Sequence, residues 1–111
     1  MHSNISEEKY MTNIDRISKM EGILDESLSI IDEMHALSEK IDDHADQLKE
    51  LLDYYSSENY TADIEDDENG LLPSNLKRGV LSEDGIWNML ESYRSAAIEM
   101  METALNVLKN N

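Results

Sequence analysis

The chain has 111 residues, of which 25 are acidic and 9 are Lys or Arg, so its formal net charge at pH 7 is −16. This length corresponds to one domain with a modest core, and the negative field would repel both nucleic acid and anionic membranes. No cysteine is present, which excludes a disulfide framework and a thiolate metal site.

Composition also favours helices and the cytoplasm. The chain has one proline, four glycines and no phenylalanine, a balance that favours helix over sheet. The N-terminal MHSNISEEKY has neither the basic start nor the apolar run of a signal peptide, and no stretch approaches the roughly 18 apolar residues of a membrane span. We therefore expect an all-α cytoplasmic protein that binds neither nucleic acid nor membranes directly.

The first expected element is a helix over residues 6–57 with a repeating apolar face. With Ile17 at heptad position a, all a and d positions between Tyr10 and Tyr55 are apolar or aromatic except Asn13, Ser27 and Ser38. Residues at e and g widen the stripe to a face typical of helical bundles. These flanking residues are Ile14, Ile23, Leu28, Ile30, Leu37 and Leu51.

A helix of about 50 residues would be roughly 75 Å long, so a break deserves consideration. An interruption near residues 35–38 would produce a helical hairpin instead. No turn-forming residue lies there, and we therefore expect one long helix. Ser6 is the expected N-cap, and Thr12 is a second candidate for a later start.

A connector over residues 58–81 follows. Its segment LPSNLKRG has Pro73 and Gly79 at spacings that suit the first position and the C′ position of a helix of one or two turns. Tyr54, Tyr55 and Tyr60 cluster at its start, either as an aromatic contact on which the connector packs or as a recognition patch.

The connector's acidic run, EDDENG, resembles the opening of a calcium-binding loop. Glu65, Asp67 and Asn69 are weak candidate ligands for a cation. The twelfth position of such a loop is Leu76 here, where calcium requires a bidentate carboxylate. A solvated acidic turn is therefore the simpler interpretation, and we expect no metal, no cofactor and no catalytic residue.

The last expected element is an amphipathic helix over residues 82–109, with Ser82 as N-cap. Its apolar stripe comprises Ile86, Leu90, Tyr93, Ala97, Met100, Ala104 and Val107, flanked by Trp87, Met101 and Leu108. We expect it to fold back antiparallel to the first helix. Because it can cover only about half of that helix, a homodimer is the expected source of the remaining apolar surface.

The segments YYSSENY (54–60) and DDENGLLPSNLKRGVLSED (66–84) resemble a family of small acidic proteins of unknown function, found mainly in Gram-positive bacteria. The family's pattern pairs two tyrosines and a serine with a later DExGxxPxxLKxGVLSED motif. This chain has Tyr60 where the family tends to have tryptophan, and Gly85 where it tends to have a larger residue. The resemblance implies a helical fold built around the connector and supplies no catalytic residue.

These observations favour a non-enzymatic protein–protein interaction or adaptor module. The candidate partner-binding residues are Tyr55, Tyr60, Lys77, Arg78 and Trp87. One alternative is an acidic inhibitor that mimics nucleic acid, because rows of carboxylates can imitate phosphates to a basic groove. Another is a cation-responsive regulator that uses the acidic run at 63–68.

Overall fold

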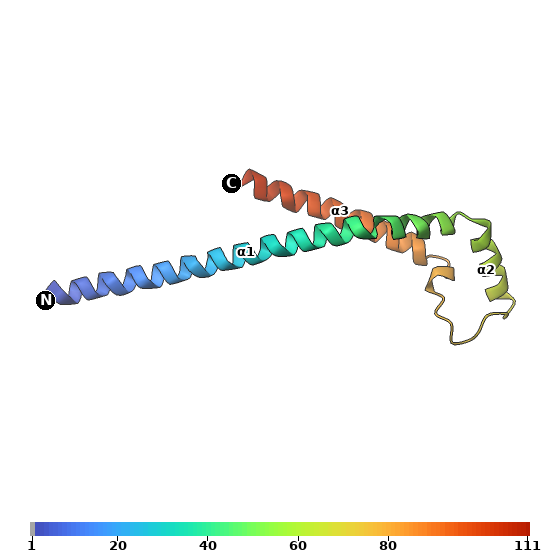
Figure 1. Cartoon of the computed structure of the whole chain (residues 1–111), viewed down its shortest axis with the longest axis horizontal. Coiled ribbons are helices and arrows are strands. Elements are labelled where there is room, and N and C mark those ends of the chain that lie inside the picture. The colour runs from blue at the N-terminus through green and yellow to red at the C-terminus, as the bar shows by residue number, and fades with distance from the viewer. Residues whose placement is uncertain (1) are drawn as a thin grey trace. The chain divides into compact units, whose positions relative to one another are not determined.

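A computed structural model describes the backbone of residues 2–111 and the side chains of residues 12–111. These residues form three α-helices and one short 3-10 helix, and no strand occurs among them (Figure 1). The elements are α1 (His2–Tyr55), α2 (Glu58–Glu68), η1 (Gly79–Leu81) and α3 (Gly85–Lys109). The all-α prediction is confirmed. None of the helices in this part of the chain combines the length and apolar character that crossing a membrane requires.

The first helix is longer than predicted and unbroken. α1 runs for 54 residues, about 80 Å at 1.5 Å per residue, and is a continuous helix through residue 36 (Figure 1). It begins at His2, so the predictions that Ser6 or Thr12 starts the helix are wrong. The side chains of residues 1–11, including any cap made by Ser6, lie outside the described residues.

Two compact units divide the chain after Leu48. The described part of the first unit is helical throughout, and its large apolar side chains from Ile14 to Leu37 are 37–59% exposed. The second unit contains the last turns of α1 together with α2, η1 and α3. Within this unit, Ile86 is 3% exposed and is the one buried apolar residue among those described.

The predicted connector contains a helix that the sequence analysis missed. Ser57 is the N-cap of α2, with its Oγ accepting a hydrogen bond from the Tyr60 amide at 3.2 Å. At the other end, the amides of Gly70 and Leu71 donate to the carbonyls of Asp67 and Asp66 at 3.1 and 3.0 Å. This pair of hydrogen bonds forms a Schellman cap, which requires a positive φ at Gly70, and its φ is +69°.

The short helix predicted between Pro73 and Gly79 is wrong. Among backbone amides, only that of Leu76 donates to the Pro73 carbonyl, in a turn-type hydrogen bond of 3.1 Å. Gly79 is not a C′ residue, because it begins η1 and does not have a positive φ. The glycine that ends a helix is Gly70, nine positions earlier.

The last helix begins three residues later than predicted, at Gly85. Ser82 is not its N-cap, because its Oγ donates to the Gly79 carbonyl at 2.7 Å and so closes η1. Asp84 occupies the cap position without a side-chain hydrogen bond. The 3-10 helix packs against both α2 and α3, so it joins the connector to the final helix.

Candidate functional site

A tyrosine cluster fixes α2 to the end of α1. The Tyr54 hydroxyl donates a hydrogen bond to Asp63 Oδ2 at 2.7 Å. The Tyr60 ring lies edge-on to Tyr54 and Tyr55, with ring centroids 5.4 and 5.2 Å away, a geometry that favours aromatic pairs. The cluster is therefore the aromatic contact on which the connector packs.

The hydrogen bond to Asp63 also changes the acidity of Tyr54. It raises the pKa of the Tyr54 phenol to about 12, with further contributions from burial and from the negative charge of the Asp63 carboxylate. Losing the phenol proton would remove the hydrogen bond and place two negative charges side by side. Asp63 therefore keeps the Tyr54 hydroxyl protonated, and the hydrogen bond between them acts as a structural contact.

Arg78 ties the loop after α2 back onto the helix. Its Nη1 forms an ion pair with the Asp67 carboxylate, and its Nη2 donates to the Pro73 carbonyl at 2.9 Å. The two side chains of the ion pair are 35% and 25% exposed, so water screens their attraction only in part. Arg78 thereby closes the loop between α2 and η1 with one side chain.

The start of α3 lies very close to η1. A methyl group added at Gly85 would collide with the Gly79 carbonyl oxygen and with Ser82 Oγ. Only a residue without a side chain fits this approach. Glycine at position 85 therefore allows the chain to turn tightly after η1, immediately before the buried Ile86.

The five predicted partner-binding residues separate into two groups. Tyr55, Tyr60 and Arg78 are half-buried, and all three make contacts within the second unit. Lys77 and Trp87 are exposed, Trp87 at 54%. A partner could therefore reach Trp87 and Lys77 without any rearrangement of the cluster.

The three weak cation candidates lie at the end of α2. Asp67 directs its carboxylate at Arg78, and Asn69 is the C-cap residue of the helix. Among the described residues, no group of three or more carboxylate or histidine side chains is arranged to hold a metal ion. The run EDDENG therefore forms a capped helix end in this structure.

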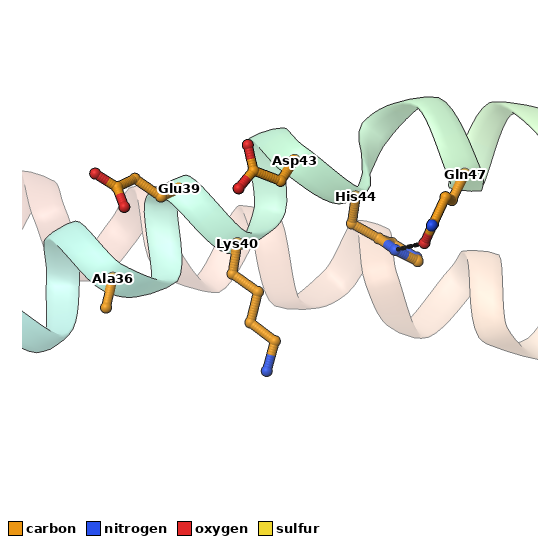
Figure 2. Close-up of a pocket in the computed structure, with 6 residues that line it drawn as sticks. All are labelled: Ala36, Glu39, Lys40, Asp43, His44 and Gln47. Carbon is orange, nitrogen blue, oxygen red and sulfur yellow. Dashed lines mark hydrogen bonds between the residues drawn. The ribbon is translucent and has the colours of Figure 1, made fainter.

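A shallow open depression lies along α1, lined by six residues of that helix (Figure 2). The lining residues are Ala36, Glu39, Lys40, Asp43, His44 and Gln47. His44 Nδ1 and Gln47 Oε1 are 3.1 Å apart and share a hydrogen bond. Because one helix supplies every lining side chain, the depression is a polar strip of helix surface.

The largest chemical feature of the structure is exposed apolar surface on both long helices. On α1 it forms the stripe from Ile14 to Leu37. On α3, Ile98 and Leu105 extend the predicted stripe, and the apolar arc occupies roughly half of the circumference at about 100° per residue. Met101 and Leu108 within it are 72% and 74% exposed. The predicted stripe and its flanking residues already cover most of this arc, but Ile98 and Leu105 were omitted from the prediction.

A protein-family match covers most of the chain, including the whole connector. Residues 17–103 match the family described as Domain of unknown function (DUF4298). The chain belongs to this family. The DUF4298 match begins within the apolar stripe of α1, contains the whole connector and ends within α3. No curated protein and no solved structure matches the chain.

Proposed function

We propose that this DUF4298 protein is a non-enzymatic protein–protein interaction module of the bacterial cytoplasm, and that it also associates with a second copy of itself. The observation that carries the proposal is the exposed apolar surface of its helices. Helices of soluble proteins normally bury such faces against a partner element. Ten large apolar side chains on α1 from Ile14 to Leu37 are each more than a third exposed.

The second unit supplies the surface for the adaptor role. Trp87 is 54% exposed and lies one residue beyond the buried Ile86. Exposed tryptophans on a rigid support are frequent anchors of protein interfaces. Lys77 adds an exposed positive charge in an otherwise acidic chain, and an acidic group on a partner would complement it.

Affinity capture from the native host tests the proposal. The tagged protein, a Trp87→Ala variant and an Asn88→Ala control are each washed at low and high salt. Trp87 and Asn88 are adjacent and both exposed, so the control matches the variant in position. We expect a partner that survives high salt with the wild type and the control, and that is lost with Trp87→Ala.

Two results would contradict the proposal. Recovery of no protein except the bait would remove the adaptor role. A basic nucleic-acid enzyme that is released by salt, irrespective of Trp87, would instead support the acidic-mimic function, because charge-dominated contacts weaken strongly with ionic strength.

A further inference from the structure

We propose that the apolar stripe of α1 between Ile14 and Leu37 is a self-association surface on which a second copy of the chain packs antiparallel, with the two-fold axis between Leu24 and Ser27. The inference rests on the proposed function and specifies one of its partners. It depends only on α1, whose stripe is continuous and exposed throughout this range.

No other element of the chain is long enough to cover α1. α3 has 25 residues against 54 in α1, which corresponds to about 38 Å against about 80 Å. Wherever α3 lies, it leaves at least half of the length of α1 uncovered. A second copy provides a stripe of the same length and the same spacing.

The exposed area suits a stable interface. A leucine or isoleucine side chain contributes on the order of 100 Å² of apolar surface when fully exposed, and the ten large apolar side chains of the stripe are about half exposed. The stripe therefore offers roughly 500 Å² of apolar area per copy. Standard interfaces bury about 800 Å² per partner, a little over half of it apolar.

The spacing of the stripe is self-complementary in the antiparallel direction. Reversing one helix brings heptad positions a and d opposite each other. Ile17 then faces Met34 of the second copy, and Met20 faces Ile31. Leu24 faces Ser27 at the axis, and the polar Asn13 is opposite the polar Ser38. Apolar layers thus continue on both sides of the axis and end in a polar layer.

The charges along α1 favour the same direction. Residues 12–20 carry Arg16 and Lys19 against one acidic residue, whereas residues 31–39, which lie opposite them in this register, carry three acidic residues and no lysine or arginine. Antiparallel packing places the basic 12–20 segment of one copy beside the acidic 31–39 segment of the other.

A parallel arrangement is less favourable in charge. It would bring Arg16 at position g near Glu21 at position e of the second copy, which is one attractive pair per side. It would also bring the acidic 32–46 segments of the two copies side by side. Like charges at that spacing repel within the screening length of about 8–10 Å.

Disulfide trapping distinguishes the two directions, because the chain has no natural cysteine. Full-length Ile17→Cys and Met34→Cys variants are oxidised alone and as a mixture assembled under reducing conditions. Gly22→Cys and Ser29→Cys, which occupy the outer f positions of the same pairing, form the control mixture. Each variant is first checked for wild-type helix content by circular dichroism.

We expect the Ile17→Cys and Met34→Cys mixture to give on the order of tenfold more linked dimer than either variant alone or the control mixture. Linked dimer in each variant alone would show a parallel pair and overturn the proposal. A monomeric wild type in light scattering, or a dimer that no mixture traps, would also overturn it. A partner captured through Trp87 would leave the proposed adaptor role standing in all of these cases.

Discussion

At the residue scale, one glycine determines where the missed helix ends. Gly70 has a φ of +69°, whereas Gly79 has no neighbouring atom within 4 Å of an added methyl group and no positive φ. We expect Gly70→Ala to lower the free energy of unfolding by about 1 kcal/mol, because alanine is strained in the left-handed region. Gly79→Ala should change it by less than about 0.5 kcal/mol.

Urea unfolding of both variants measures the difference. Equal effects of the two substitutions would contradict the Schellman cap, since the two changes are chemically identical and differ only in backbone conformation.

Tyr54 gives the protein a stability change in alkali. Free tyrosine has a pKa of about 10, and the pKa of Tyr54 is raised to about 12. Below pH 10 its contribution to stability is complete. Between pH 10 and 12 the unfolded phenol ionises while the folded one keeps its proton, so the free energy of unfolding falls as pH rises.

Substitution of the hydroxyl tests this contact. We expect Tyr54→Phe to lower the free energy of unfolding by about 1 kcal/mol at neutral pH, and to flatten the decline above pH 10. Tyr93→Phe, on α3, is the control and should leave the steep decline in place. A wild-type slope in Tyr54→Phe, measured by urea unfolding at several alkaline pH values, would argue against the Asp63 contact.

At the scale of elements, α2 shows what the sequence could predict and what it could not. The long helix, the terminal helix and their apolar stripes follow from periodicity, and the structure confirms them. α2 has no such signal, because its half-buried side consists of Tyr60, Asp63, Ile64 and Asp67 rather than an apolar stripe. Asp63 and Asp67 of α2 instead contact Tyr54 and Arg78, which lie nine and eleven positions away in the sequence.

The caps of α2 were visible in the sequence but ambiguous. Ser57 and Gly70 bound the helix, yet Pro73 and Gly79 give a similar start-and-stop pattern nearby. The contacts of Asp63 with Tyr54 and of Asp67 with Arg78 favour the first pattern, because they form only when residues 58–68 are helical and pack on the end of α1. Tyr60, which packs against Tyr54 and Tyr55, and Arg78, which pairs with Asp67, therefore have structural roles, although both were predicted as partner-binding residues.

The Arg78 contact can be separated from the effect of charge alone. Lys77 and Arg78 are adjacent, and replacing either with alanine removes one positive charge. Only Arg78 pairs with Asp67 and Pro73. We expect Arg78→Ala to weaken the closure of the loop by about 1 kcal/mol, which is a factor of about five.

Hydrogen exchange of the α2 amides reports this closure directly. Faster exchange over residues 58–68 in Arg78→Ala, with wild-type rates in Lys77→Ala, is the expected outcome. Equal acceleration in both variants would mean that net charge, and not the ion pair, holds the segment.

At the scale of the whole molecule, stability and association are coupled. A helix with an exposed apolar stripe gains most of its stability from packing rather than from propensity. If the stripe of α1 is covered by a second copy, the folded state is favoured by mass action. The melting temperature should then rise with protein concentration, an effect that a stable monomer would not show.

A matched pair of substitutions assigns this dependence to the stripe. Ile31→Asp and Ser29→Asp each add one negative charge two residues apart on α1, but Ile31 belongs to the stripe and Ser29 to the opposite face. Because the long-range repulsion is the same, only the loss of apolar packing distinguishes them. We expect Ile31→Asp to lower the melting temperature and to abolish its concentration dependence. Ser29→Asp should keep the wild-type melting temperature and its concentration dependence, as measured by circular dichroism across a dilution series. Retention of the concentration dependence in Ile31→Asp would place the self-association surface on another face, with the wide apolar arc of α3 as the next surface to substitute.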